Sequence, residues 1–371
     1  MMLQNSNDLL KSASLYNYGQ GAFNVNTISQ AKALIEIHEL LRAPLMIQVA
    51  DLGTGFLGGQ YAFKQSTLAD KQKGAKIIGQ AVKELAQNAS IPIALHLDHG
   101  SSFESCLAAI DGGFTSVMFD GSHFDYEENV RLTRQVVQYA HEKGVSVEGE
   151  LGILAGVEDD VFSETSTYTN PLQALDFIER TQVDALAISY GTTHGPNKGK
   201  DVKLRTEIVT AISELLRHEQ KFCAIVSHGS STIPTYLVEG INALGGKVQG
   251  AGGISIPQLK KSISSGINKI NVDTDIRLAI MRNFRELLNQ KHDITDPKVK
   301  ALLDLVEGAP AELDPRHVMP NIMDYVMTNH IASHDLAKVN GCIENGVKEI
   351  VAQLIVSFGM VGQAEKVKTL S

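Results

Sequence analysis

The sequence lacks the features that mark membrane, secreted and nucleic-acid-binding proteins. No uninterrupted apolar run approaches the roughly 20 residues that a membrane-spanning helix needs. The first six residues, Met1 to Ser6, have no basic and apolar signal pattern. Basic residues are not in excess, since 33 Lys and Arg face 42 Asp and Glu, for a net charge of −9. We therefore expect a cytoplasmic protein that has neither a membrane nor a nucleic acid as its partner.

Cysteine is also scarce, and its placement does not predict disulfides. The three cysteines, Cys106, Cys223 and Cys342, are far apart in the chain and form no CxxC pair. We expect them to be reduced residues of the core. With 371 residues, of which 43% are hydrophobic and 20% charged, the chain is long enough for one (β/α)₈ barrel or for two smaller domains.

Short apolar segments alternate eight times with segments whose apolar residues recur at helical spacing. The expected strands end near residues 26, 49, 97, 119, 151, 188, 226 and 272, and residues 51–59 read as a glycine-rich loop. Eight strands joined by crossover helices favour an α/β fold, a (β/α)₈ TIM barrel over residues 1–294, with a doubly wound open sheet as the alternative. Residues 295–371 contain several prolines and then an amphipathic helix at 347–358. They are expected to form a C-terminal helical extension that packs on the barrel or on a neighbouring subunit.

Polar residues lie at or just beyond the C-terminal ends of six of the expected strands. They are Asn24, Asp98, His99, Glu150, His194, His228 and Asn271. In a barrel the carboxyl ends of the strands meet at one rim, which is where active sites of this fold lie. Residues far apart in the sequence would therefore converge there.

Three of these residues are histidines followed by glycine, namely His99, His194 and His228. Three imidazole ligands with an open fourth position are the layout of a catalytic zinc site. The alternative is that Asp98 caps the following helix and that the histidines make local hydrogen bonds. Histidines on expected helices, such as His38, are interpreted as solvated.

Phosphate recognition is a second theme of the same strand ends. Gly195 with Lys198, the run Gly229 to Ser231 and the run Asn271 to Thr274 combine flexible backbone, hydroxyls and helix N-termini, which favour anions. Ser231 and Thr274 are equally interpretable as simple helix N-caps. Arg277 is placed either to bind a second phosphate or to pair with Asp273 four residues earlier.

Five motifs in this order resemble those of the class II, metal-dependent ketose-bisphosphate aldolases. They are His96–Gly100, Val147–Gly152 continuing through Val157–Asp159, Gly191–Gly195, His228–Ser231 and Asn271–Asp275. The resemblance runs from about Tyr16 to Ile280. It implies a lyase with a zinc ion held by His99, His194 and His228.

The resemblance also implies roles for further residues. Glu150 matches a carboxylate that holds the metal in an alternative, more buried position. Asp98 matches the group that works on the C4 hydroxyl, and Glu158 matches the base, on a mobile loop, that moves the proton of the dihydroxyacetone phosphate carbon. The residues that match the pocket for the substrate phosphate are Gly195, Lys198, Gly229, Ser231, Asn271 and Thr274, and Asn24 lies on the same rim. The resemblance also implies a monovalent cation, such as Na⁺ or K⁺, near this pocket. Asp273 and Arg277 match residues at the other end of the sugar.

The reaction so implied is the reversible cleavage of fructose 1,6-bisphosphate to dihydroxyacetone phosphate and glyceraldehyde 3-phosphate, through an enediolate that the metal stabilises. No Schiff-base lysine is then needed. The extension after Thr295 suggests a homodimer or homotetramer. Alternatives are an aldolase for tagatose bisphosphate or another phosphorylated ketose, a metal hydrolase, and a non-catalytic metabolite-binding paralogue.

Three features depart from the family pattern. Ala50 and Asp51 stand where a serine that touches the substrate phosphate is common, and Ser227 stands where leucine usually precedes the third histidine. The stretch Met319–Asn340 has no counterpart that we can place. The metal and acid–base residues thus follow the family pattern, whereas the substrate end departs from it.

Overall fold

The computed structural model describes residues 3–154, 156–158, 161–163, 167–195, 202–328 and 333–370, with the backbone alone for residues 63, 156–158 and 161–163. Eight parallel strands close into a barrel in the order β1-β10-β9-β8-β5-β4-β3-β2. The strands are β1 (Gln20–Asn24), β2 (Leu45–Ala50), β3 (Ile93–Gly100), β4 (Ser116–Phe119), β5 (Ser146–Leu151), β8 (Ala185–Ile188), β9 (Ala224–Ser227) and β10 (Ile267–Val272). The predicted (β/α)₈ barrel is therefore confirmed.

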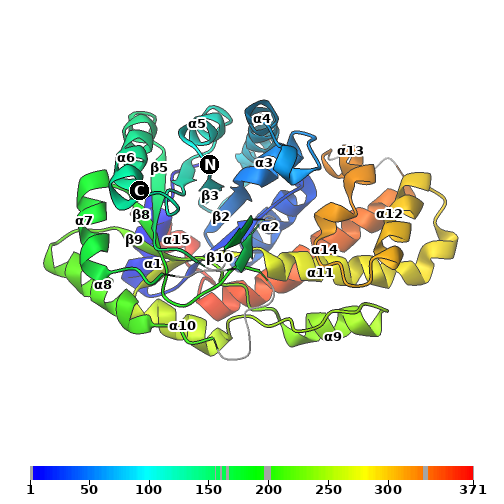
Figure 1. Ribbon diagram of the computed structural model, residues 1–371. Helices are drawn as coiled ribbons and strands as arrows, with labels where there is room; N and C mark the ends of the chain where they lie inside the picture. The colour runs from blue at the N-terminus through cyan, green and yellow to red at the C-terminus, as the bar shows by residue number, and fades with distance from the viewer. Residues whose placement is uncertain are drawn as a thin grey trace.

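Helices surround the barrel on its outer side (Figure 1). Those of the barrel region are α2 (Ile28–Leu41), α3 (Asp51–Leu57), α4 (Leu68–Leu85), α5 (Phe103–Asp111), α6 (Tyr126–Glu142), α7 (Pro171–Thr181), α8 (Thr206–His218), α9 (Thr235–Ala243), α10 (Ile256–Ser265) and α11 (Thr274–Leu287). A short hairpin of β6 (Gly156–Glu158) and β7 (Val161–Ser163) interrupts the alternation after β5. Within the described residues, no helix combines the length and the apolar character needed to cross a bilayer.

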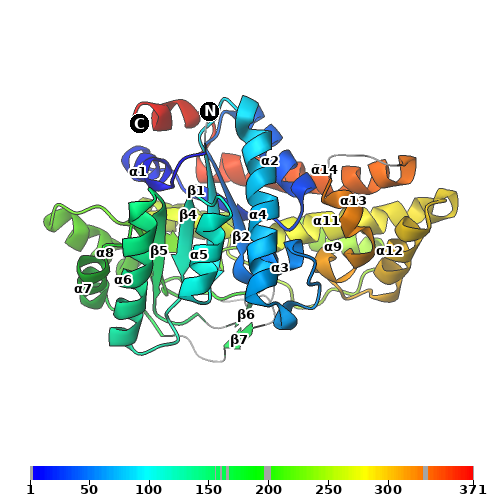
Figure 2. The same ribbon diagram turned by 90° about the horizontal axis from the view of Figure 1, so that it is seen from above.

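The two termini close the end of the barrel opposite the hairpin. Figure 2 shows α1 (Asn7–Tyr16) and α15 (Ala364–Lys368) at one end and β6–β7 at the other. Leu9 and Leu10 of α1 and Val367 of α15 join the buried cluster inside the barrel. The strands contribute mostly small residues to that cluster, five of them alanines, which leaves room for the leucines of α1.

The C-terminal part of the chain forms α12 (Pro297–Gly308), α13 (Met323–Val326) and α14 (His334–Phe358). The long helix α14 packs against both α2 and α11, the helices that follow the first and the last barrel strand. It begins 13 residues before the expected start at Val347. Ser333 caps it, because its side chain accepts the N–H of Leu336.

Two local expectations were wrong. Residues 51–57 form helix α3 rather than a loop. The glycines there and on α4 allow the two helices to touch: a Cβ at Gly74 would lie 1.7 Å from the carbonyl oxygen of Thr54, and one at Gly58 would lie 2.1 Å from that of Asp70.

His38 of α2 is fully buried rather than solvated. Its Nδ1 lies 2.8 Å from the carbonyl oxygen of Leu34, and its ring packs edge-on against Phe23. Burial lowers the pKa of His38 to about 4, so the ring is neutral near pH 7.

Candidate active site

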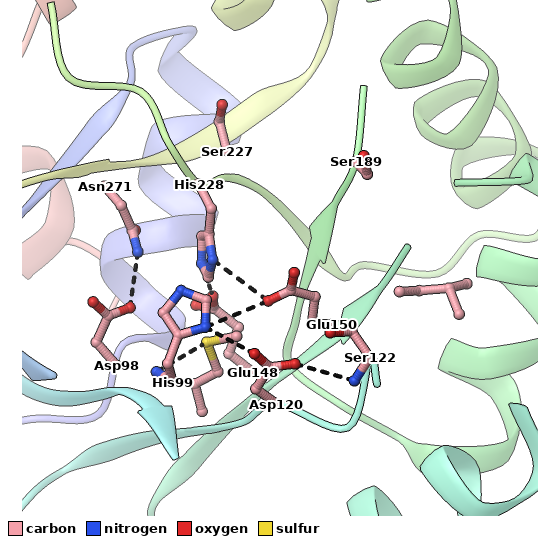
Figure 3. Close-up of polar contacts among 12 residues, drawn as sticks. Asp98, His99, Asp120, Ser122, Glu148, Glu150, Ser189, Ser227, His228 and Asn271 are labelled. Atoms are coloured by element: carbon pink, nitrogen blue, oxygen red, sulfur yellow. Dashed lines mark hydrogen bonds and ion pairs between the residues drawn. The ribbon is translucent and has the colours of Figure 1, made fainter. Parts of the chain in front are cut away.

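His99 near the end of β3, His194 after β8 and His228 after β9 come together at the carboxyl end of the barrel. Figure 3 shows two of them, His99 and His228, side by side. The His99 ring centroid lies 4.5 Å from that of His228 and 5.3 Å from that of His194. Each histidine offers one ring nitrogen, and these nitrogens all lie within 4.8 Å of one another. His99 adopts a left-handed backbone conformation with φ of 51°, which is uncommon for a residue other than glycine and typical of functional sites.

A second group of ligand atoms shares His99 with this cluster. It adds Glu150, at the end of β5, and Asp120, which follows β4, and the offered atoms again lie within 4.8 Å of one another. The Asp120 carboxylate lies 3.0 Å from Nδ1 of His99 and accepts the backbone N–H of Ser122. Burial alone would raise the pKa of Asp120, but the hydrogen bond from His99 and the N–H of Ser122 outweigh it and hold that pKa well below its usual range. Glu150, which the resemblance matches to a more buried metal position, lies among these ligand atoms. Asp120 was not among the expected site residues.

The ring of His228 is fixed by a buried ion-pair network. Its Nε2 lies 2.8 Å from Oε1 of Glu148, and the other oxygen of Glu148 accepts from the ammonium of Lys269 at 2.8 Å. These three side chains are at most 2% exposed. Burial would raise the pKa of Glu148, but Lys269 and His228 hold it far below its usual range. Glu148 is therefore a carboxylate that keeps Nε2 of His228 protonated and turns Nδ1 toward the cluster.

Nδ1 of His228 makes no hydrogen bond with any described residue although it is buried. It lies 3.5 Å from Oε2 of Glu150. A buried imidazole nitrogen aimed at two other histidines is explained by a cation between them. Imidazole and carboxylate donors suit a divalent ion such as zinc, so the residues fit the metal that the sequence resemblance implies.

Asp98, the neighbour of His99, is held by three amide side chains. Asn24 and Gln48 donate to its Oδ2 at 3.0 and 3.2 Å, and Asn271 donates to its Oδ1 at 2.9 Å. Asp98 is 1% exposed. The carboxylate does not cap α5, because Ser102 does so. Gln48 was not among the expected site residues, although it lies on β2 in register with Asn24 of β1.

The described residues of the expected phosphate pocket lie in the loops after β8 and β9, at the end of β10 and at the start of α11. Gly195 and Gly229 have positive φ values of 83° and 60°. Ser231 Oγ accepts the backbone N–H of Thr274 at 3.2 Å, and more weakly that of Asp273 at 3.4 Å. Ser231 therefore joins the β9 loop to the N-terminus of α11, and a phosphate there would extend or replace those contacts. Lys198 lies outside the described residues, as does the side chain of Glu158 in β6.

Arg277 pairs with Asp273, one of the two alternatives weighed for it, and makes a second contact that was not expected. It forms a bidentate pair with Asp273, and its Nη1 donates to Oδ2 of Asp314 at 2.9 Å. Asp314 belongs to the C-terminal part of the chain and is also held by Arg316, whose Nη2 lies 2.7 Å away. Burial would raise the pKa of Asp314, but the two guanidinium groups hold it well below its usual range. The sequence offered no periodic or strand-end signal for Asp314 or Arg316.

Comparisons with known proteins identify relatives of this chain. The family model of class II fructose-bisphosphate aldolase matches residues 4–363. A fructose-bisphosphate aldolase of Thermus caldophilus is 36% identical over 366 residues, covering 98% of this chain and all of the relative. One from Giardia intestinalis is 39% identical over 293 residues, covering 78% of this chain and 84% of the relative.

Solved structures show the same architecture. The YdjI aldolase from Escherichia coli K12 superposes with a TM-score of 0.66 at 26% identity, covering 98% of this chain and 100% of that one. A fructose-bisphosphate aldolase from Campylobacter jejuni gives a TM-score of 0.67 at 22% identity, covering 98% of this chain and 97% of that one, which supports the fold. The family match and the relatives together establish that the chain belongs to the class II fructose-bisphosphate aldolase family.

Proposed function

We propose that this chain cleaves fructose 1,6-bisphosphate reversibly to dihydroxyacetone phosphate and glyceraldehyde 3-phosphate, with a zinc ion bound by His99, His194 and His228. The observation that carries the proposal is the buried carboxylate of Asp98, which three amide side chains hold directly beside this trihistidine cluster. A cation at the cluster supplies a Lewis acid that stabilises the negative charge released when the C3–C4 bond breaks. A mere binding protein would have no use for a fixed, buried base at this place.

Asp98 is the group that takes the proton of the C4 hydroxyl in the cleavage direction and returns it in the synthetic direction. Its three amide donors fix the plane of the carboxylate, so that the base meets the hydroxyl without reorganisation. Glu158 is proposed to move the proton at the reacting carbon of dihydroxyacetone phosphate. Its position on the β6–β7 hairpin, at the carboxyl end of the barrel, suits a lid that excludes water (Figure 2).

The phosphate of the dihydroxyacetone half is assigned to the loop ends at Gly195, Gly229 and Ser231 and to the N-terminus of α11 at Thr274. The N-terminus of a helix and its dipole favour an anion at this place. Asn271 would serve both halves of the site, since its amide holds Asp98 and it lies at the end of β10. Lys198, a nearby monovalent cation, a second metal position at Glu150 and a homodimer or homotetramer remain predictions.

The residues expected at the distal end of the sugar favour a second candidate substrate, a ketose that carries no phosphate at that end. Arg277 already binds two carboxylates, and Ala50 offers no hydroxyl. A distal phosphate would have to displace Asp314 or share the guanidinium with it. This arrangement also suits a ketose phosphate with an uncharged distal end.

The test is a substrate panel with the zinc-loaded chain: fructose 1,6-bisphosphate, tagatose 1,6-bisphosphate and fructose 1-phosphate. We expect kcat/KM to be highest for fructose 1,6-bisphosphate, and Arg277→Met to lower it about tenfold or more by removing a charge-assisted contact to the distal phosphate. The same variant should leave cleavage of fructose 1-phosphate nearly unchanged. A preference for the monophosphate that Arg277→Met does not alter would instead support the second candidate.

A further inference from the structure

Ser227, which departs from the family pattern, is part of a buried chain of hydroxyl groups. Its Oγ lies 2.6 Å from the phenol oxygen of Tyr190 and 2.6 Å from Oγ of Ser230. The phenol of Tyr190 also donates to Ser262 on α10 at 3.3 Å. All four residues are at most 1% exposed. Ser227 directs its hydroxyl away from the cluster of histidines and carboxylates, so it is no ligand there (Figure 3).

This row of hydrogen-bonded hydroxyl groups links the loop that carries His194 to the loop that carries His228. Tyr190 comes four residues before His194, and Ser227 comes immediately before His228. The loops also touch through their backbones, because a Cβ at Gly229 would lie 2.4 Å from the carbonyl oxygen of Thr193. A small shift of the β9 loop would therefore press its backbone against the β8 loop.

Ser230 extends the link into the loop assigned to phosphate binding. Its hydroxyl donates to the carbonyl oxygens of Ser227 and His228 at 3.3 and 3.2 Å, across the turn that contains Gly229. The next residue, Ser231, is joined to α11. The turn at Gly229 is thus held at two points: Ser227 and Ser230 connect it to Tyr190, and Ser231 connects it to α11.

We propose that Tyr190, acting through Ser227 and Ser230, is a positioning residue that holds the β9 loop in the conformation that binds the substrate phosphate. The inference rests on the proposed function, because it concerns the same phosphate pocket. The hydroxyl groups act as one unit: removal of the phenol oxygen leaves the buried hydroxyl of Ser227 without its partner across the loops. Ser227 would keep only Ser230, which lies on its own loop, so the β9 loop would no longer be tied to the β8 loop and would lose its fit to the phosphate.

The test compares Tyr190→Phe, Ser227→Ala and the double variant with Tyr18→Phe as a matched control. Tyr18 is 1% exposed and its phenol donates to the carbonyl oxygen of Leu9 in α1, at the opposite end of the barrel. Each zinc-loaded protein is titrated with dihydroxyacetone phosphate by calorimetry, its unfolding temperature is measured, and KM and kcat are determined with fructose 1,6-bisphosphate.

We expect Tyr190→Phe and Ser227→Ala each to weaken binding of dihydroxyacetone phosphate about fivefold to tenfold. Because both changes break the same link, the double variant should bind about as well as either single variant. KM should rise by a similar factor while kcat stays within about twofold. Tyr18→Phe should leave the dissociation constant unchanged even if its unfolding temperature falls. If Tyr190→Phe does not fold, the milder Ser230→Ala is expected to show the same loss of binding.

Unchanged binding in Tyr190→Phe, with a fall in unfolding temperature like that of Tyr18→Phe, would overturn the positioning role, and so would fully additive losses in the double variant. Wild-type chain that binds dihydroxyacetone phosphate but cleaves no ketose phosphate would contradict the proposed function while the binding data still decide the role of Tyr190. Wild-type chain that binds no dihydroxyacetone phosphate would contradict both.

Discussion

Replacement of Asp98 by asparagine separates acid–base chemistry from metal binding. Asp98→Asn keeps the shape of the side chain but replaces one acceptor oxygen by an NH₂ group. The carboxylate now accepts three N–H bonds, two on Oδ2 and one on Oδ1. In the variant at least one amide of the cage therefore faces another donor, and the base is lost. A positioned general acid–base is worth about 10²- to 10⁴-fold, so we expect kcat to fall by that factor, or about 3 to 5 kcal/mol.

The assay measures triose phosphate release from saturating fructose 1,6-bisphosphate, with metal content and circular dichroism determined on the same samples. Bound zinc should stay at the wild-type level, because Asp98 is not among the clustered ligand atoms. Asp111→Asn, an exposed aspartate at the end of α5, is the matched control and should leave kcat unchanged. Wild-type turnover in a folded, zinc-loaded Asp98→Asn protein would refute the role given to this carboxylate.

Three further predictions follow from buried contacts. Glu148→Gln should weaken zinc binding about 10- to 100-fold in a chelator competition, because it removes the carboxylate that orients His228; unchanged affinity would contradict that role. The pKa of His38, about 4 in the folded chain, lies below the usual 6.5 of the unfolded chain, so the unfolded state takes up the proton first. Its contribution of about 3 kcal/mol is then complete above pH 6.5 and lost as the pH falls to about 4, and urea titrations of His38→Gln should show a flatter pH dependence over that window. Gly74→Ala should destabilise the fold by about 2 kcal/mol or more, because the added Cβ would meet the backbone of α3. The control is Gly341→Ala in α14, where nothing lies within 4 Å of the added Cβ, and it should stabilise the fold slightly. Equal unfolding temperatures for the two variants would contradict the packing argument.

The barrel was predictable because its strands are short apolar runs that end in polar residues. The period of strands and helices set the fold, and the strand-end rule brought His99, His194 and His228 together without any local metal motif. Helix α3 was missed because glycine usually marks a loop, whereas here Gly58 and Gly74 allow two helices to approach closely. That distinction depends on a tertiary contact.

The supporting residues of the site were harder to find from the sequence. Glu148 and Lys269 lie inside strands β5 and β10, where an apolar environment is the default expectation for a barrel. Alternation was a usable signal, because Glu148 lies two residues before Glu150, so both side chains point to the same face of β5. Asp120 comes directly after β4, just as Asp98 and Glu150 lie near the ends of their strands. The strand-end rule would therefore have included Asp120 if it had been applied to every strand.

The C-terminal part was the least predictable. Asp314 reaches Arg277 from a segment of short helical turns, and such a contact between distant segments leaves no periodic pattern in the sequence. His38 was misplaced for a related reason. It lies on an amphipathic helix, and its ring packs against Phe23 of β1, a tertiary contact that the spacing of residues along α2 does not reveal.

Metal-dependent cleavage is the most direct test of the account as a whole. Fructose 1,6-bisphosphate is incubated with the chain as purified, after removal of metal by a chelator, and after zinc is added back, and the triose products are trapped. We predict cleavage that chelation abolishes and zinc restores, with no restoration in a His228→Ala variant. Cleavage that survives complete metal removal, or equal activity in His228→Ala, would contradict the claim that the histidine cluster binds a catalytic metal.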